Sequence, residues 1–431
     1  MSNGLMRSWI EPDPVDVSPE FQAGIGGHPL VAQILARRGI RDLTAARAFL
    51  DPQVYRPCPA ENLPGLIKAC ERIEQALARR EQICVWGDFD VDGQTATTLL
   101  VSTLRKLLPE EDQGLVSYHI PVRARESHGV NWENLQPIIE RGANLIVTCD
   151  TGISSLEALN KARLRGIDVI ITDHHDLPED LPEAHSIVNP KFLPSGHPLS
   201  SLPGVGVAYK VAEALLQRAG QEDEAAALLD LAALGIVADL ANQAADTRYL
   251  LQRGLQILRQ TPRTGLAMMM EIAGLQQAHL TEEHIGFVLG PRLNALGRLD
   301  DANPAVELLT TNDSGRARVL ATHLEGLNAR RRLLTSQVLA GALAQIEKNP
   351  AILDQAALVL EHAEWPAGVI GIVASELSER FNRPVILFSA PPGQPARGSA
   401  RSVEGVNITA AIAAQQHLLL SFGGHPMAAG L

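Results

Sequence analysis

The sequence predicts an α/β protein in which a parallel sheet covered by helices is joined by a long helix to a smaller α/β domain. First, short apolar runs alternate with helical patterns between residues 83 and 176, which is typical of a parallel sheet with both faces covered. Second, a helical pattern without proline runs over residues 318–348. Third, apolar runs and Gly-rich turns resume beyond Pro350, which indicates a second α/β domain.

The expected strands of the first domain end in acidic residues. The runs ICVW, NLIVTC and IDVIIT are each followed within two residues by an aspartate: Asp88, Asp150 and Asp173. In parallel sheets ligands bind at the carboxyl ends of the strands. The segment LDLAALGIVADLA is an apolar helical pattern that brings Asp239 to its end. We therefore expect several carboxylates to gather at one edge of this sheet.

The same patterns predict the order of the domains along the chain of 431 residues. A helical lead-in is expected first, then the sheet domain, a helical region that contains the long connecting helix, and the second α/β domain. The predicted boundaries are 1–60, 61–250, 251–350 and 351–431.

Composition narrows the class of protein. A hydrophobic content of 45% and a charged content of 20% are those of a globular protein. We find no secretory signal and no run of roughly 18 apolar residues, so we expect a cytoplasmic protein without a membrane span. A net charge of −12 does not exclude nucleic acid, because arginines cluster locally and net charge does not describe a groove.

The acidic and imidazole side chains at the predicted sheet edge have the chemistry of a metal site. Oxygen-rich sites with one or two histidines suit Mn²⁺ or Mg²⁺, and two such ions activate water and stabilise an in-line phosphoryl displacement. Bound cations also explain why aspartates occupy alternate positions in DFDVD, where their charges repel. The candidate catalytic residues are Asp88, Asp90, Asp92, Asp150, His174, His175 and Asp239.

Each motif also has a simpler interpretation. DFDVD alone could be a calcium loop or an acidic turn, and the Asp-His-His sequence could cap a helix. Asp239 by itself could be an ordinary residue at a helix end. Their joint placement at one sheet edge favours the metal site.

The motifs GDFDVDG, CDTGISS, TDHH and GIVADL, in this order, resemble those of the DHH phosphoesterase superfamily. A narrower resemblance is to the RecJ family of bacterial single-strand-specific 5′→3′ DNA exonucleases. It covers nearly the whole chain and rests on VNPK, LPGVGVAYK, GPRLNALGRLD, GVIGIVASEL, RGSARS and GGHPMAAGL. It implies that residues 61–250 are a DHH domain and 351–431 a DHH-associated substrate-binding domain, which together clamp single-stranded DNA.

The resemblance also implies roles for individual residues. Asp92 and His175 would support the metal ligands or the scissile phosphate, and Ser399 and Arg401 would contact a terminal 5′-phosphate. Arg123 would line the DNA path, Arg292 or Arg298 would add a phosphate contact, and His425 would face the substrate. The implied metal ligands are Asp88, Asp90, Asp150, His174 and Asp239.

The chain departs from the family pattern in three places. It has Ser127-His128-Gly129 where the family usually has Gly-Tyr-Gly, and Trp365-Pro366 where Trp-His is common. It also stops at Leu431, where RecJ proteins continue into an oligonucleotide-binding fold, so we expect a core fragment or a shortened relative.

The function that the resemblance implies is metal-dependent, single-strand-specific 5′→3′ DNA exonuclease activity that releases mononucleotides in DNA repair and recombination. The alternative is a DHH-family oligoribonuclease or cyclic-dinucleotide phosphodiesterase. Those relatives generally have a histidine where this chain has Cys84, which favours RecJ. An inactive scaffold would have lost metal ligands that are present here. The implied partners are single-stranded DNA with a 5′ end, single-stranded DNA-binding protein and a RecQ-type helicase.

Overall fold

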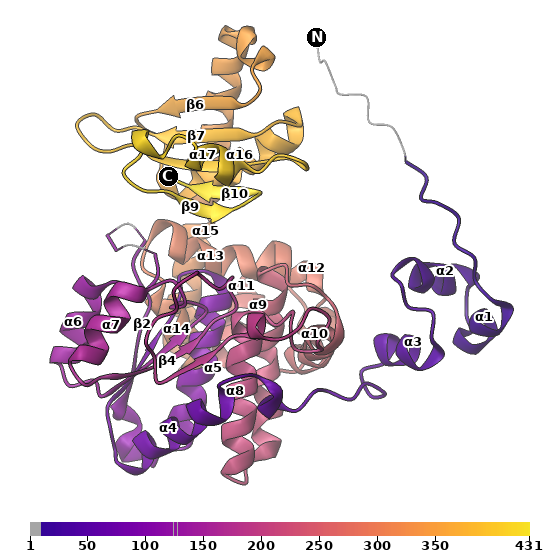
Figure 1. The fold of residues 1–431 in the computed structure, drawn as a ribbon, viewed down its shortest axis with the longest axis vertical. Helices are drawn as coiled ribbons and strands as arrows, with labels where there is room; N and C mark the ends of the chain where they lie inside the picture. Colours follow the sequence, from indigo (N-terminus) through magenta and orange to yellow (C-terminus); the bar gives the residue numbers. More distant parts are fainter. Residues whose placement is uncertain (1–9, 124, 127) are drawn as a thin grey trace. The chain divides into compact units, whose positions relative to one another are not determined.

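The computed structural model of the chain describes residues 10–123, 125–126 and 128–431 (Figure 1). It contains two compact units, Pro12–Glu325 and Gly326–Leu431, and the division between them falls inside the long helix α15 (Ser314–Lys348). Each unit contains one five-stranded sheet, parallel in the first unit and mixed in the second. The predicted fold class is confirmed.

The sheet of the first unit has the strand order β2-β1-β3-β4-β5, and all its described pairs are parallel. Every residue of β1 and β3 is buried, which explains their uninterrupted apolar sequences. The strands are β1 (Ile83–Trp86), β2 (Val116–His119), β3 (Leu145–Cys149), β4 (Asp168–Thr172) and β5 (Ser186–Val188).

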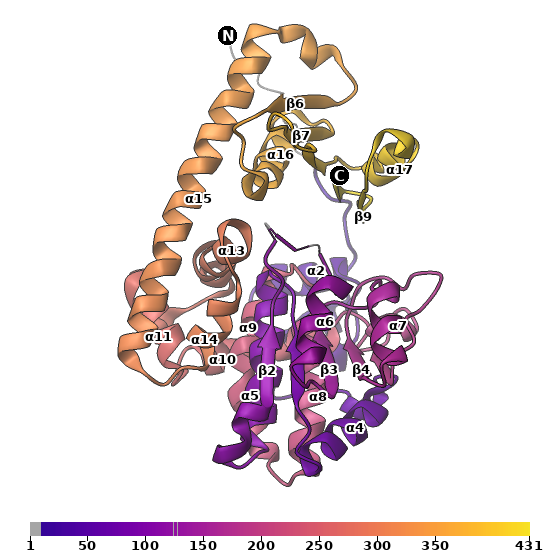
Figure 2. The same cartoon turned by 90° about the vertical axis from the view of Figure 1, so that its left-hand side faces the viewer.

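Helices cover this sheet (Figure 2). Trp86 and Ile146 share a core cluster with residues of α6 and α7, whereas α5 and α8 pack against the sheet, each other and α9. Two sheet faces are therefore buried, as the sequence predicts. The helices are α4 (Leu66–Ala78), α5 (Val91–Lys106), α6 (Trp132–Glu140), α7 (Leu156–Leu164), α8 (Gly204–Arg218) and α9 (Leu229–Ala238).

Helix α5 is buried although its sequence is rich in threonine. Asp90 caps it by accepting a hydrogen bond from the backbone N–H of Gly93. The hydroxyl groups of Thr95, Thr97 and Thr98 each donate to the carbonyl oxygen four residues earlier, at 2.7 Å. Because these polar groups are satisfied locally, α5 can lie beneath the metal-site loop without a desolvation penalty.

The remaining helices of the first unit precede and follow this core. The predicted helical lead-in corresponds to α1–α3, where Phe21, Leu35 and Ala46 form a small separate core. A π-helix over Ile285–Leu289 leads directly into α13. The bounds are α1 (Pro19–Ile25), α2 (Pro29–Arg37), α3 (Leu43–Leu50), α10 (Ala245–Leu258), α11 (Thr264–Ile272), α12 (Glu282–His284), α13 (Gly290–Leu299) and α14 (Asn303–Thr310).

The sheet of the second unit has the order β6-β7-β8-β10-β9, with β6 parallel to β7 and the other neighbours antiparallel. Helix α16 packs on β7 and β8. Its N-cap is Pro366, so the departure from the family pattern coincides with a helix start, where proline is well tolerated. The elements are β6 (Leu358–His362), α16 (Ala367–Phe381), β7 (Val385–Ser389), β8 (Arg397–Arg401), α17 (Ile408–Ala413), β9 (Gly423–His425) and β10 (Ala428–Gly430).

Short 3₁₀ segments connect several of these elements. They cover Ala60–Asn62, Glu110–Leu115, Pro190–Phe192, Glu222–Leu228, Gln277–His279, Pro350–Asp354 and Gln416–Leu418. Among the residues that the structure describes, no helix combines the length and apolar character needed to span a bilayer.

Candidate metal centre

Acidic residues meet at the carboxyl edge of the first sheet. Asp150 directly follows β3 and Asp173 directly follows β4, while Asp88 comes two residues after β1. These three strands are adjacent and parallel, so their carboxyl ends lie side by side. The predicted gathering of carboxylates at this edge is what the fold produces.

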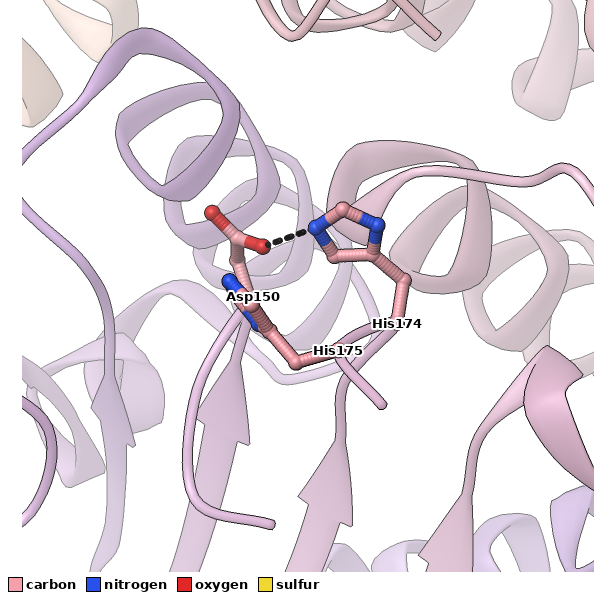
Figure 3. Close-up of side chains that lie close together, drawn as sticks. All are labelled: Asp150, His174 and His175. Atoms are coloured by element: carbon pink, nitrogen blue, oxygen red, sulfur yellow. Dashed lines mark ion pairs between the residues drawn. The ribbon is translucent and has the colours of Figure 1, made fainter. Parts of the chain in front are cut away.

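The seven candidate catalytic residues form overlapping groups whose ligand atoms lie within 4.8 Å of one another. Asp150 and His174 are the closest pair, with Asp150 Oδ1 3.0 Å from His174 Nε2 (Figure 3). His174 Nε2 is also 3.8 Å from Asp92 Oδ2. The groups are Asp88, Asp90 and Asp150; Asp92, His174 and Asp239; and Asp150, His174 and His175.

Two carboxylate oxygens in this cluster are buried without a hydrogen bond. Asp88 Oδ1 and Asp150 Oδ1 accept none from any residue that the structure describes, although both side chains are almost fully buried. Asp150 Oδ1 has the ion pair with His174, so the lack of a partner is clearest for Asp88 Oδ1. A buried carboxylate oxygen without a partner is costly, and a bound cation removes that cost. The donor set, carboxylate oxygens with imidazole nitrogen, therefore fits Mn²⁺ or Mg²⁺.

Asp92 differs from its neighbours because it is bound to backbone. Its Oδ2 and Oδ1 accept hydrogen bonds from the N–H groups of Gly204 (2.7 Å) and Val205 (2.8 Å), at the first turn of α8. The positive end of the helix dipole there stabilises a carboxylate. Asp92 thus holds α8 against the cluster, and it also belongs to one of the metal-capable groups.

Two glycines allow the helices to approach this cluster. A Cβ at Gly204 would lie 2.6 Å from Asp150 Oδ1, and a Cβ at Gly235 would lie 2.8 Å from Asp92 Oδ1. Both positions therefore require glycine because a side chain would collide with the site carboxylates. The motif LPGVGVAYK consequently positions the metal cluster, and its glycines have a packing role.

Asp173 was predicted to lie at this edge, but no role in the site was assigned to it. Its Oδ1 accepts hydrogen bonds from the backbone N–H groups of His174 (2.7 Å) and His175 (3.1 Å) and lies 2.7 Å from His175 Nδ1. Its Oδ2 accepts from the backbone N–H of Ile153. Asp173 therefore fixes both histidines of the Asp-His-His sequence. Its position directly before two histidines was the signal that could have suggested this role.

The backbone at Asp150 is unusual. Its φ of +60° is in the left-handed region, which few non-glycine residues adopt, although aspartate is among the more tolerant. Its N–H donates to the carbonyl oxygen of Thr172 on β4. Strained backbone of this kind concentrates at functional sites, where the surrounding structure enforces it.

Burial and mutual repulsion alter the protonation of the cluster. Burial first, and then the negative charges of neighbouring aspartates, raises the pKa of Asp90 and raises the pKa of Asp92 and Asp150 well above the usual range. The same causes raise the pKa of Asp239 to about 7. The cluster therefore favours a cation, or protons in its place.

For the pair formed by His175 and Asp173, the pKa shifts favour the charged form of each group. Burial alone would lower the pKa of His175, but the hydrogen bond and charge of Asp173 raise it to about 9. Burial acts against ionisation of Asp173 as well, yet the hydrogen bonds from His175 and from backbone lower the pKa of Asp173. Asp173 consequently stays charged without a metal.

An aromatic and cationic cluster borders Asp88. The guanidinium of Arg123 lies over the ring of Phe89, 4.9 Å from its centroid, and the His128 ring meets Phe89 edge to face at 5.3 Å. His128 Nε2 is 3.6 Å from Asp88 Oδ2. The predicted residue Arg123 therefore reaches the rim of the centre, whereas His128 was noted only as a departure. Ser127, named with it, lies outside the described residues.

Helix α13 packs on the loop that carries Asp88 and Asp90. Gln94 Nε2 donates to the carbonyl oxygens of Phe89 and Leu293, and a Cβ at Gly297 would collide with the Phe89 carbonyl. Arg298 follows Gly297 in this helix. Arg292 makes an ion pair with Glu325 (2.6 Å) and donates to the Val288 carbonyl, so in this structure its guanidinium is occupied by protein partners.

The predicted residues of the second unit share one face of its sheet. Arg401 and His425 are both register partners of Ala428, and Ser399 lies two residues from Arg401 on β8. Arg401 Nη1 lies 3.2 Å from Ser399 Oγ, and a Cβ at Gly371 of α16 would lie 2.8 Å from Ser399 Oγ. The fold thus places Ser399, Arg401 and His425 on one face of the sheet, with Ser399 and Arg401 beside α16.

Comparisons with known proteins agree with these observations. Residues 82–236 match the DHH family, N-terminal domain, and residues 354–431 match the DHHA1 domain. A solved structure of exonuclease RecJ bound to manganese is 34% identical, with a TM-score of 0.75 over 87% of this chain and 91% of that one. The Thermus thermophilus RecJ structure with Mn²⁺ is 32% identical, with a TM-score of 0.81 over 96% of this chain and 58% of that one.

The similarity to curated relatives is also extensive. The single-stranded-DNA-specific exonuclease RecJ of Bacillus subtilis is 41% identical over 94% of this chain, which spans 50% of that relative's length. RecJ of Escherichia coli is 39% identical over 94% of this chain and 71% of the relative. Together with the two matched domains, this identity shows that the chain belongs to the RecJ family of DHH proteins.

Proposed function

We propose that the chain is a metal-dependent, single-strand-specific 5′→3′ DNA exonuclease that releases mononucleotides. The observation that carries the proposal is the buried Asp88 oxygen without a hydrogen bond, close to the Asp150–His174 ion pair, in a chain of the RecJ family. A carboxylate and imidazole cluster of this kind is suited to hydrolysis of phosphodiester bonds.

The proposed metal ligands are Asp88, Asp90, Asp150, His174 and Asp239. Two bound Mn²⁺ or Mg²⁺ ions would supply an activated water and stabilise charge on the phosphate oxygens. Asp92 holds the first turn of α8 against the ligands through the Gly204 and Val205 N–H groups. His175, oriented by Asp173, would hold a proton beside the scissile phosphate.

The proposed substrate contacts are cationic or hydroxyl groups. Ser399 and Arg401 would bind the terminal 5′-phosphate, and His425, on the same sheet face, would contact the strand next to it. Arg123 would line the path of the strand, and Arg292 or Arg298 would bind a further phosphate. A planar guanidinium suits a terminal phosphate because it can donate two parallel hydrogen bonds.

The wider context is proposed on family membership. Residues 61–250 would be the catalytic domain, 251–350 the helical region and 351–431 the substrate-binding domain. A role in DNA repair and recombination, with single-stranded DNA-binding protein and a RecQ-type helicase as partners, belongs to the same proposal, as does a cytoplasmic location.

The test is digestion of DNA labelled at its 3′ end and phosphorylated at its 5′ end, in single-stranded and duplex form, with Mn²⁺, Mg²⁺ or a chelator. We expect mononucleotides from the single strand only, with a metal present, and with the label retained until the last products. Digestion from the 3′ end, or of duplex ends, would contradict the proposal. Preference for di- and triribonucleotides or cyclic dinucleotides would support the alternative DHH phosphodiesterase function.

A further inference from the structure

We propose that His128 is a positioning residue of the metal centre, which holds the outer oxygen of Asp88 so that the inner oxygen stays directed at the metal. The inference deepens the proposed function and rests on its metal centre. It concerns a residue that differs from the tyrosine usual at this position in the family that the sequence resembles.

The two oxygens of Asp88 have different surroundings. Oδ1 is buried and accepts no hydrogen bond among the described residues, whereas Oδ2 lies 3.6 Å from His128 Nε2. The Asp88 side chain is 6% exposed and the His128 side chain is 60% exposed. Oδ1 is therefore available to a metal, and Oδ2 faces a ring at the solvent boundary that can approach it.

Contacts of the His128 ring and of the residues after it fix the position of His128. The His128 ring packs edge to face on Phe89, with the ring centroids 5.3 Å apart, and Arg123 lies over the Phe89 ring. The next residue, Gly129, has a φ of +80°, and the N–H of Val130 donates a hydrogen bond to Ser155 Oγ at 3.0 Å. A Cβ at Gly129 would make a tight contact of 3.1 Å with Ser155 Oγ, and the positive φ itself favours glycine here.

The chemistry needs only a donor on the ring nitrogen that faces Asp88. With its proton on Nε2, a neutral imidazole can donate to Oδ2. The separation of 3.6 Å is longer than a hydrogen bond, so the exposed ring must move about 0.5 Å toward Oδ2 to form one. Hydrogen bonds to the outer oxygen of a ligating carboxylate fix its orientation. Loss of such a partner typically lowers metal affinity or activity by 10–100-fold.

The test measures Mn²⁺ affinity without DNA, by calorimetry and by the electron paramagnetic resonance signal of free Mn²⁺. We expect His128→Ala to weaken Mn²⁺ binding by about tenfold, at the lower end of that range because the ring is exposed. His128→Gln retains an N–H donor and should stay within about threefold of the parent. His279→Ala, at an exposed histidine whose ring lies beside Gln276, is the matched control and should leave the affinity unchanged.

His128→Phe keeps an edge-to-face contact with Phe89 but removes the donor, so it should match His128→Ala even if alanine loosens the loop. Thermal unfolding of the metal-free variants checks the fold. Unchanged Mn²⁺ affinity in the alanine and phenylalanine variants would overturn the inference, as would an equal loss in the glutamine variant. Because no DNA is present, these outcomes are distinct from failure of the proposed nuclease activity.

Discussion

The carboxyl edge of the first sheet carries buried negative charge, whereas the Arg401 face of the second sheet carries positive charge that is partly exposed. At the first edge, Asp88 and Asp150 are 4% and 2% exposed, and their charges are crowded together. On the second face, Arg401 is half-buried and His425 is exposed, and the Arg401 guanidinium donates to the Ala400 carbonyl at 2.8 Å. The carboxylates of the first edge are shielded from water, whereas the Arg401 guanidinium is stabilised by solvent and by a backbone carbonyl.

The contrast matches the two proposed roles, metal-dependent chemistry at the first edge and recognition of the substrate at the second face. A buried acidic cluster is strongly destabilised until a cation binds, so its residues should show large effects when changed. A half-exposed basic face is screened by water and salt, so single changes there should have smaller effects. Substitutions in the two regions can test this difference.

The largest effect is expected for Asp150→Asn. The amide cannot supply the anionic oxygen that faces His174, so turnover with Mn²⁺ should fall by more than about a hundredfold, beyond the range for residues that only support ligands. The metal-free variant should melt at a temperature equal to or above that of the parent, since repulsion is relieved. Turnover close to the parent's would remove Asp150 from the metal site.

Asp173→Asn should lower turnover and Mn²⁺ affinity by about 10–100-fold. Asparagine replaces one of two oxygens that together bind the Ile153, His174 and His175 groups, so the two histidines lose their orientation. Asp176→Asn is the control, because Asp176 lies in the same loop, is mostly exposed and pairs with Lys191. Equal behaviour of the two variants would show that Asp173 does not position the histidines.

Arg401→Ala should reduce activity about tenfold or somewhat more on strands with a 5′-phosphate, and much less on strands with a 5′-hydroxyl. The estimate corresponds to about 1.5 kcal/mol, the lower end of the range for lost charge-assisted hydrogen bonds, because this face is partly exposed to water. Arg383→Ala is a control in the same unit, since Arg383 donates to the Gln355 carbonyl on an exposed surface. If Arg401→Ala slows both substrates equally, the phosphate pocket lies elsewhere.

The smallest effect is a change in stability with pH. The raised pKa of Asp92, Asp150 and Asp239 means that the folded, metal-free chain binds more protons than the unfolded chain. Stability should therefore be greatest near pH 4 and fall as the pH rises to about 7, the value for Asp239, lowering the melting temperature by several degrees. Saturating Mn²⁺ should flatten this dependence, and a rising melting temperature without metal would contradict it.

Much of the centre was predictable because the buried strands are recognisable in the sequence. Apolar runs such as ICVW and LIVTC predict buried parallel strands, and the aspartates after them must then share an edge. The long helix also follows from its pattern, although α15 begins at Ser314 rather than near residue 318. The role of Asp173 was not predicted because it depends on hydrogen bonds to backbone, which composition does not encode.

Other features depend on packing between distant segments. The sequence offers no sign that Asp92 holds the first turn of α8, because the contact joins residues more than a hundred positions apart. The ion pair between Arg292 and Glu325 on α15 also joins distant positions, and the sequence gives no sign of it. The antiparallel half of the second sheet was likewise absent from the predicted pattern.

The left-handed backbone at Asp150 has a consequence for how this protein can change over generations. The position is restricted twice, once by the metal chemistry and once by a φ of +60° that favours glycine, asparagine and aspartate. A descendant that lost the proposed activity but kept its fold should drift there to asparagine or glycine rather than to alanine or valine. Residue 150 would then record the lost activity in its identity, and an alanine substitution made in the laboratory disturbs backbone and ligand at the same time.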